Sequence, residues 1–556
     1  MSTRTSRWRR RRVSVNCFLI SSAVFTGLGL LILTLRSIDP STDLPIKNTA
    51  LQIVEKDESF SNLIDKTLNK SEKAKVKKNV KSCATVEEMG EIFSKGYRNE
   101  SLRVRRIIQN HFALNGASRV RGLSSDQFCR HGFVIGKASE AGLGNEMYKI
   151  LTAAALSVML NRSLIIGQTR GKYPFGDYIS YSNVSFTLKE VKHLWRQNGC
   201  LTKYGRHLVM RIDDFQKPAR TNVLCSNWRE WDQPIIWFQN TTDAVAAQFF
   251  LKNIHTEMRK AASNLFGMPE NLELRPNVFG ELMRVLISPS ENVQRAVNWA
   301  LNDGADPDIA LHMRMLMNRS VRAVQAALGC FKKAVQDLPS ISKPKVVLVS
   351  DTPSTMKDIA PNLAEFAEVL RFDYEHYGNI SGEMYKLNNL NFRVKDWGPA
   401  PRWVAFVDFF LASRAKHAVI SGANRRVGTT YAQLIAALAA ANRLEENSST
   451  LSSITFFSSF HSNLLSGGLR FQVGWGHIWN RFAGQLSCHN QSNQCALTPL
   501  LPPAWWDGLW QSPLPRDIRR MEAYGVRLSG FGTFDDDRLN SFCSSRKNVV
   551  VTVPLI

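Results

Sequence analysis

Several common functional signatures are missing from this sequence of 556 residues. No group of cysteines and histidines has the spacing of a zinc site, and no complete Gly-x-Gly-x-x-Gly loop is present. No convincing Asp-x-Asp follows a predicted strand, and a solvated surface explains the acidic runs at residues 213–214 and 535–537. We therefore expect neither a metal nor another cofactor. We also find no internal repeat.

The N-terminal end lacks acidic residues, and the segment after it lacks charge. The first twelve residues contain six arginines, and Val13–Leu35 is a run of 23 uncharged residues. As a helix, this run spans about 35 Å, enough for a hydrocarbon core of about 30 Å. The arginines predict that residues 1–12 stay in the cytosol and that the rest enters the secretory lumen. The alternative is a cleaved signal peptide, but Arg36–Asp39 fits its cleavage site poorly.

The cysteines and glycosylation sequons agree with a lumenal location. Of nine cysteines, Cys17 lies in the predicted span and eight lie beyond it, an even number compatible with disulfides whose pairing the sequence leaves open. We expect Asn161 and Asn318 to carry no glycan, because they lie within or beside predicted core motifs. The nine sequons begin at Asn69, Asn99, Asn161, Asn183, Asn240, Asn318, Asn379, Asn447 and Asn490.

The chain is strongly basic, with a net charge of +24. A solvated basic surface explains this charge without any function. The alternative is attraction to anionic ligands such as nucleotide sugars or acidic polymers. A nucleic-acid partner is not expected in the secretory lumen.

The composition divides the chain into a tethering part and an ordered head. Residues 36–82 are polar and lysine-rich and predict a stem. We predict two α/β domains, at residues 83–300 and 301–445, because about 320 residues of alternating strands and helices are too many for one typical core. Residues 446–556 form an extension with five tryptophans and three cysteines. Its aromatic side chains either stack on sugar rings or pack against the main body.

Strand-like and helix-like segments alternate between residues 133 and 441, which is typical of parallel sheets. The predicted strands are 133–136, 164–166, 309–314, 346–349 and 418–420, and the predicted helices are 103–114, 145–160, 320–338, 404–415 and 430–441.

Three segments place polar side chains just past predicted strands, at the edge where parallel α/β proteins bind ligands. His312–Arg314 offers a guanidinium fork suited to phosphate oxygens, although His-x-Arg is common by chance. Ser350–Thr352 offers an acid and two hydroxyls for a ribose or a base, or forms a simple turn. Ser421–Thr430 joins a strand to an alanine-rich helix.

The third segment is the most informative of the three. Thr430 and Gln433 form a capping-box pattern, which predicts that the helix begins there. A helix N-terminus attracts anions, and Arg425 and Arg426 add positive charge. A purely structural strand–turn–helix is the alternative. Gly142–Asn145 also follows a strand and opens a helix, but it is a lone glycine loop.

The order of these motifs resembles that of the fucosyltransferase superfamily. The resemblance covers residues 133–441 and includes Gly142–Asn145, Ala310–Arg314, Cys330–Val335, Val347–Asp351 and Asp408–Ser413. It implies an α/β fold of the GT-B type, with two facing Rossmann-like domains after a transmembrane helix and stem. It also implies an inverting enzyme that uses GDP-fucose and no metal.

The resemblance assigns roles to single residues. Arg314 would contact the β-phosphate and stabilise the departing diphosphate, which needs no metal where fixed cations and N–H groups receive the developing charge. His312 and Asp351 would lie toward the guanine and ribose, and Thr429 and Thr430 would bond phosphate oxygens. The residues predicted to bind the nucleotide sugar are Asn145, His312, Arg314, Ser350, Asp351, Ser421, Thr429 and Thr430.

One feature departs from the family pattern. Many relatives carry an acid after His-x-Arg, whereas Met315–Met317 follows here. The nearest candidates for a general base are Glu140, Glu146 and Asp177, and activation by water or substrate geometry is the alternative. Asn145 would approach the sugar from the facing domain.

Three hypotheses follow for the function. The first is a Golgi fucosyltransferase, single-pass with its head in the lumen, acting on a glycan or glycoprotein. The second is a transferase on the same scaffold that uses another nucleotide sugar. The third is a catalytically silent, membrane-anchored carbohydrate-binding protein. The acceptor and the oligomeric state are not readable from the sequence.

Overall fold

The computed structural model of the protein describes most of its second half and much of its first. All described residues belong to the compact unit Lys75–Ile556. The predicted tail, span and stem lie outside them, and no helix in the part that is described has the length and apolar character needed to cross a membrane. The described residues are 96–138, 142–167, 175–214, 223–239, 250–267, 275–315, 321–338, 343–381, 400–401, 403–422, 430–445, 454–459, 495–497, 500, 522–527, 535–546 and 549–556.

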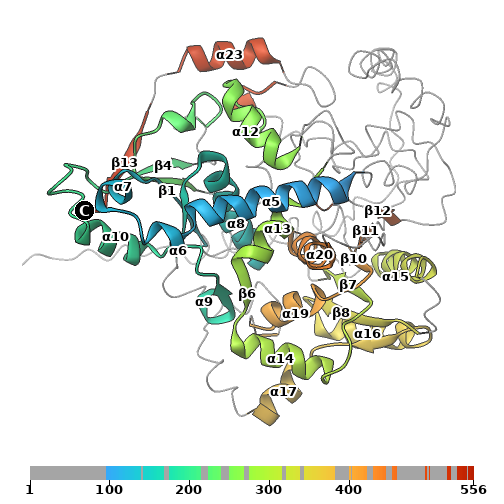
Figure 1. Cartoon of the computed structure of the whole chain (residues 1–556). Coiled ribbons are helices and arrows are strands. Elements are labelled where there is room, and N and C mark those ends of the chain that lie inside the picture. Colours follow the sequence, from blue (N-terminus) through green and yellow to red (C-terminus); the bar gives the residue numbers. More distant parts are fainter. Residues whose placement is uncertain are drawn as a thin grey trace, which may run out of the picture. The chain divides into compact units, whose positions relative to one another are not determined.

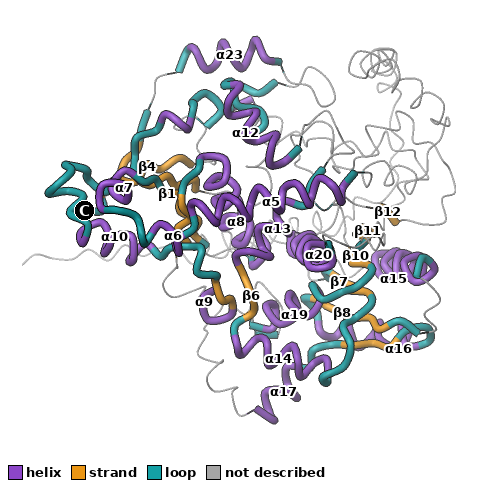
Figure 2. Tube along the Cα trace, viewed as in Figure 1, coloured by secondary structure: helices purple, strands orange, loops and turns teal. Residues whose placement is uncertain are grey.

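The first sheet has five strands in the order β13-β4-β5-β1-β2, of which β1 and β4 are labelled in Figure 2. Four of them run parallel, and the last strand of the chain, β13, pairs antiparallel with β4 at the edge. The strands are β1 (Phe133–Lys137), β2 (Ser163–Gly167), β4 (Val209–Asp214), β5 (Ile235–Gln239) and β13 (Val551–Pro554).

The second sheet has six strands in the order β12-β11-β10-β7-β8-β9. All pairs are parallel except that of β11 with β12. The strands are β7 (Ile309–Met313), β8 (Lys345–Ser350), β9 (Glu368–Leu370), β10 (Ala418–Gly422), β11 (Thr455–Ser459) and β12 (Cys495–Leu497). A separate antiparallel pair joins β3 (Ile179–Tyr181) to β6 (Ile287–Pro289).

Helices pack on both faces of each sheet, as the near-continuous apolar strands require (Figure 1). Those of the first half are α5 (Tyr97–Asn115), α6 (Ala117–Val120), α7 (Ser125–Arg130), α8 (Leu143–Leu160), α9 (Phe175–Tyr178), α10 (Leu188–Gln197), α12 (Thr256–Phe266), α13 (Val278–Leu286) and α14 (Glu291–Leu301). Those of the second half are α15 (Val321–Gln336), α16 (Pro353–Ala364), α17 (Tyr374–Ser381), α19 (Val404–Ala412), α20 (Thr430–Arg443) and α23 (Asp536–Ser544), and a short 3-10 helix spans Trp228–Glu230.

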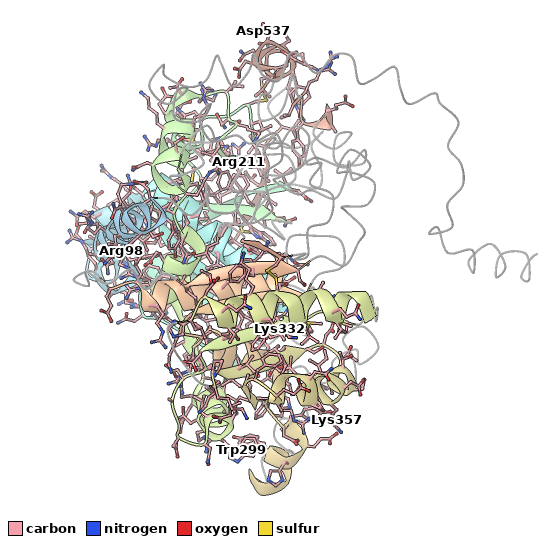
Figure 3. The ribbon with its side chains drawn as sticks, turned by 90° about the vertical axis from the view of Figure 1, so that its right-hand side faces the viewer. Arg98, Arg211, Trp299, Lys332, Lys357 and Asp537 are labelled. Carbon is pink, nitrogen blue, oxygen red and sulfur yellow. A yellow bond between two sulfur atoms is a disulfide. The ribbon has the colours of Figure 1, made fainter. Side chains whose placement is uncertain are left out.

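Alternate residues of the second sheet pack into two different cores. Leu311 and Leu348 face a cluster shared with α15 and α16, whose positions Lys332 and Lys357 mark in Figure 3. Ala310 and Val347 face the other way, into the large core that contains α19 and α20. Successive side chains of a strand lie on opposite faces of the sheet, so a strand that is buried on both faces packs into two cores. The strands and helices predicted between residues 133 and 441 are confirmed, with ends shifted by a few residues.

The C-terminal 111 residues, which were predicted as an extension, contribute strands to both sheets. β11 and β12 extend the second sheet, and β13 forms the edge of the first. The sequence analysis did not predict these strands. The five tryptophans of the predicted extension lie outside the described residues.

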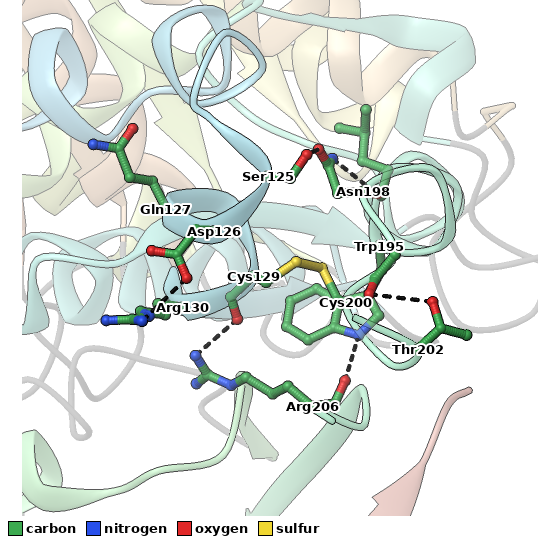
Figure 4. Close-up of a disulfide and its surroundings, with 12 residues drawn as sticks. Ser125, Asp126, Gln127, Cys129, Arg130, Trp195, Asn198, Cys200, Thr202 and Arg206 are labelled. Atoms are coloured by element: carbon green, nitrogen blue, oxygen red, sulfur yellow. Dashed lines mark hydrogen bonds and ion pairs between the residues drawn. A yellow bond between two sulfur atoms is a disulfide. The ribbon is translucent and has the colours of Figure 1, made fainter. Parts of the chain in front are cut away.

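Among the described residues, three disulfides join segments that are distant in sequence. They are Cys129–Cys200, Cys225–Cys543 and Cys330–Cys495, with sequence separations of 71, 318 and 165 residues. The expectation of disulfides is therefore confirmed. Figure 4 shows the first one, which pins α7 to the turn after α10, where Trp195 donates to the Arg206 carbonyl and Arg206 donates to the Cys129 carbonyl.

Candidate functional site

The second sheet brings the three predicted strand-end segments together. β7 lies between β10 and β8, and Met313 is level with both Gly422 and Ser350. Because parallel strands end at one edge, Arg314 and Asp351 follow side by side. The backbone N–H of Arg314 donates to the Gly422 carbonyl, 3.3 Å away, which continues the ladder one residue past the strand.

Arg314 is held by the acid that follows the neighbouring strand. Its Nε lies 3.5 Å from Asp351 Oδ2, while the other carboxylate oxygen accepts the Met315 backbone N–H at 2.7 Å. The arginine side chain remains 35% exposed and the Asp351 side chain 13%. Asp351 therefore fixes the loop after β7 and orients Arg314, and the guanidinium keeps an open side for an anion.

The two predicted site serines are buried. Ser350 donates to the Met313 carbonyl at 2.8 Å and accepts the Thr352 backbone N–H at 3.1 Å, so its hydroxyl serves the turn itself. Ser421 is fully buried, and its hydroxyl oxygen has no hydrogen-bond partner among the described residues. Of these two serines, only Ser421 has a hydroxyl that the turn does not already use.

His312 is buried next to the start of α20. Its ring centroid is 5.4 Å from that of Tyr431, the second residue of α20. Burial, reinforced by Arg314, lowers the pKa of His312 to about 3, so the imidazole is neutral at any physiological pH. Its Nδ1 has no hydrogen-bond partner in the described part of the chain. A neutral ring offers one donor and one acceptor for a neutral ligand group.

The N-termini of α8 and α20 meet directly. The Thr430 hydroxyl donates to Asn145 Oδ1 at 2.9 Å, so the two predicted site residues are in contact across the halves of the chain. Gly144 permits this approach, because a Cβ there would lie 2.8 Å from Thr430 Oγ1 and from the Tyr431 backbone nitrogen. Two helix N-termini at one place favour negative charge.

The capping box predicted at Thr430 and Gln433 stays a prediction, because the residue before α20 lies outside the described residues. α20 begins at Thr430 itself, and the bond that this hydroxyl donates leads to Asn145. The prediction that the helix starts there is confirmed. Thr429, Arg425 and Arg426 lie outside the described residues.

Two titratable residues beside the site had no predicted role. The Tyr431 hydroxyl donates to the Ala405 carbonyl at 2.5 Å, and burial and then Asp408 raise its pKa. Asp408 lies in the otherwise apolar α19, where burial raises its pKa to about 8, and among the described residues no cation pairs with it. The sequence could have indicated Asp408, because it is the single acidic residue among the nine residues of α19, which are otherwise apolar.

The candidates for a general base differ in accessibility. Glu146 is fully buried and pairs with Lys149 at 2.8 Å, which removes it from contact with a substrate. Asp177 is exposed on α9. Glu140 lies outside the described residues. Within the described ranges, no group of three or more His, Cys, Asp or Glu side chains could hold a metal.

Comparison with protein families gives one clear match. The model of a family of unknown function, DUF7810, matches residues 78–555. The chain belongs to this family. A search of the curated proteins found no match.

Comparison with solved structures finds fucosyltransferases at low similarity. A mutant of Arabidopsis thaliana FUT1 in complex with GDP has 11% identity and a TM-score of 0.43, with 77% of this chain and 91% of that chain covered. NodZ from Bradyrhizobium has 14% identity and a TM-score of 0.32, covering 55% and 92%. POFUT1 in complex with GDP has 13% identity and a TM-score of 0.32, covering 60% and 99%. Similarity at this level does not establish a shared activity for this member of the DUF7810 family.

Proposed function

We propose that this DUF7810 protein is a glycosyltransferase, and specifically an inverting fucosyltransferase that uses GDP-fucose and needs no metal. One observation carries the proposal. Arg314, oriented by Asp351 but still partly open, lies at the edge where the start of α20 meets the start of α8.

This edge suits a departing nucleoside diphosphate. Breaking a sugar–phosphate bond leaves negative charge on the diphosphate, and a fixed guanidinium beside helix N-termini stabilises that charge without reorganising. Arginine is better suited than lysine because its planar fork bonds two phosphate oxygens at once. The neutral His312 adds hydrogen-bonding capacity for a base or ribose. The order of sequence motifs supports fucose as the sugar.

We place the protein in the Golgi membrane, with residues 1–12 in the cytosol and the head in the lumen. The basic end followed by an uncharged run supports the anchor. Three disulfides support an oxidising compartment, because disulfides rarely persist in the cytosol. The acceptor would be a glycan or glycoprotein.

Nucleotide titration of the purified full-length protein tests the proposal. We expect GDP and GDP-fucose to bind more tightly than GDP-mannose, UDP or UDP-sugars. Preference for UDP would contradict the fucose assignment and favour a transferase for another nucleotide sugar. The absence of nucleotide binding would contradict the enzyme assignment and favour a carbohydrate-binding protein.

Arg314 gives the corresponding test of mechanism. Arg314→Ala removes a charge-assisted contact, and we expect GDP affinity to fall at least about tenfold and turnover to be lost with the fold intact. Arg314→Lys keeps the charge but not the fork, so it should restore GDP affinity only partly. Wild-type turnover in Arg314→Ala would remove this residue from the mechanism.

A further inference from the structure

Within the described residues, the side chains on one face of the first sheet become less buried toward its carboxyl edge, which we call the open end. Along β1, Ile135 is 3% exposed and Lys137 is half-buried. Along β5, Ile235 is fully buried and Trp237 is half-buried. Residues two apart on a strand share a face, so burial decreases along this face toward the ends of both strands.

The neighbouring strands border this open end. On β4, Asp214 is half-buried and lies level with Gln239 at the end of β5. On β2, the residue level with Lys137 is Gly167, beside which the aliphatic stem of Lys137 packs closely. The opposite face stays closed at the same level, where Phe238 is only 7% exposed.

The chemistry of this open end combines a cation with an aromatic ring on β1 and β5, while the Asp214 carboxylate lies on β4, two strands away from Lys137. Lys137 Nζ lies over Trp237, 5.5 Å from the ring centroid. No carboxylate among the described residues forms an ion pair with Lys137. Half-buried indole rings pack well against the C–H faces of sugars, and a lysine without a counter-ion favours an anion beside them.

The open end and the candidate nucleotide site belong to the same side of the molecule. β1 ends at Lys137, and α8 begins at Leu143 after a short connection. In the first turn of α8, Asn145 accepts the bond from Thr430, the first residue of the helix that follows β10. The carboxyl edges of the two sheets are therefore linked where α8 meets α20.

We propose that the open end of the first sheet binds a carboxylate-bearing sugar residue, a hexuronate, of the acceptor. This rests on the proposed transferase function and names its acceptor as an acidic glycan. The Lys137 ammonium pairs with the carboxylate, the Trp237 ring packs against the sugar, and Gln239 bonds a hydroxyl. Without the six arginines of residues 1–12, the chain keeps a net charge of +18, which acts in the same direction because it attracts polyanions over longer distances.

A pair of matched ligands tests this proposal. Full-length protein is titrated with an oligogalacturonate and with its methyl ester, which has the same backbone without the charge, in the presence and absence of GDP. We expect the acid to bind at least about tenfold more tightly than the ester, corresponding to one charge-assisted contact. Lys137→Met should abolish this difference, and Lys137→Arg should retain it. GDP affinity should be unchanged in both variants.

The control separates a specific contact from general basicity. Lys189 is exposed on α10, and Lys189→Met removes the same charge elsewhere. Equal binding of acid and ester, or equal losses in Lys137→Met and Lys189→Met, would overturn the proposal. A loss of GDP affinity in Lys137→Met, with the acid preference intact, would also overturn it and assign Lys137 to the nucleotide. If the wild-type protein does not bind GDP, only the proposed function is contradicted. The acid and the ester are also compared in the absence of nucleotide, so the proposal of a hexuronate site is still tested.

Discussion

At the scale of single residues, Gly144 controls how closely the two halves of the site approach. A Cβ at this position would lie 2.8 Å from the Tyr431 backbone nitrogen, which cannot rotate away as a side chain can. We expect Gly144→Ala to lower the free energy of unfolding by about 1–3 kcal/mol, because helices α8 and α20 must separate. Urea denaturation gives the stability, and GDP affinity should fall with it.

Gly329 provides the matched control on a helix surface. A Cβ added there meets nothing within 4 Å, and alanine is favoured over glycine in a helix interior. Gly329→Ala should therefore raise stability by about 0.5–1 kcal/mol. Equal effects of the two substitutions would show that the contact between Gly144 and α20 is not tight in solution.

His111 gives the protein a dependence on pH. Burial and the nearby His131 lower the pKa of His111 to about 4, against 6.5 in the unfolded chain. Between these values the unfolded state binds more protons, so stability must fall as the pH decreases from about 6.5 to 4. We expect a loss on the order of 1–3 kcal/mol from this residue, measured by denaturation at pH 7.5, 6 and 5.

Substitution of His111 identifies its share of the effect. His111→Leu should reduce the slope of stability against pH over this range, and His131, whose pKa burial also lowers to about 4, should supply part of the remainder. His193→Gln on the exposed face of α10 is the control and should leave the slope unchanged. An unaltered slope in His111→Leu would contradict the assignment.

At the scale of elements, α20 is fixed at both ends by the first half of the chain. At its C-terminus, Arg105 of α5 donates to the carbonyls of Ala441 and Leu444 at 2.8 and 2.6 Å. The same guanidinium bonds both oxygens of Glu281 on α13, and only 5% and 1% of the two side chains is exposed. Burial raises the pKa of Glu281, and Arg105 opposes that rise.

Removal of one partner of this pair should be costly. Arg105→Met leaves the buried Glu281 carboxylate with only the half-buried Arg284, 3.5 Å away, as a cation and frees two backbone carbonyls, so we expect a loss of about 3–5 kcal/mol. The exposed pair Arg130–Asp126 is the reference, and Arg130→Met should cost less than about 1 kcal/mol. Both are measured by urea denaturation. Similar losses in the two variants would show that α20 is not anchored through Arg105.

The sequence predicts the elements that depend on local pattern and misses those that depend on distant partners. The strands β7, β8 and β10 were predictable because each is a short run of buried apolar residues. β13 is exposed throughout and has no apolar pattern directed at a core, so only its pairing with β4 makes it a strand. Arg314 and Asp351 were predictable as site residues because each follows a short apolar strand. The contact between them, and the contact between Asn145 and Thr430, depend on distant partners and were not predicted.

Some expectations about single residues also depend on packing that no local pattern gives. Asn161 was expected to carry no glycan because it follows a core helix, yet it is exposed at the left-handed end of α8. Tyr431 and Asp408 come together only because α19 packs against α20.

At the scale of the whole molecule, two disulfides tie the C-terminal part of the chain to the segments before it. Cys225–Cys543 joins the end of α23 to the first half, and Cys330–Cys495 joins β12 to α15. Cross-links that close long loops restrict the unfolded chain most. Disulfides form and persist where thiols are oxidised, which agrees with the lumenal location that we propose for the head.

Glycosylation provides the decisive test of that orientation. Asn183 begins a sequon and is exposed in the turn after β3, so a lumenal head should carry a glycan there. We expect full-length protein made in a eukaryotic cell to lose mass when treated with peptide N-glycosidase, and Asn183→Gln to lose the mass of one glycan. Asn540→Gln, exposed but outside any sequon, is the control. A chain without any N-glycan would contradict the lumenal orientation, whereas glycans elsewhere with none at Asn183 would place this turn out of reach of the transferase that adds them.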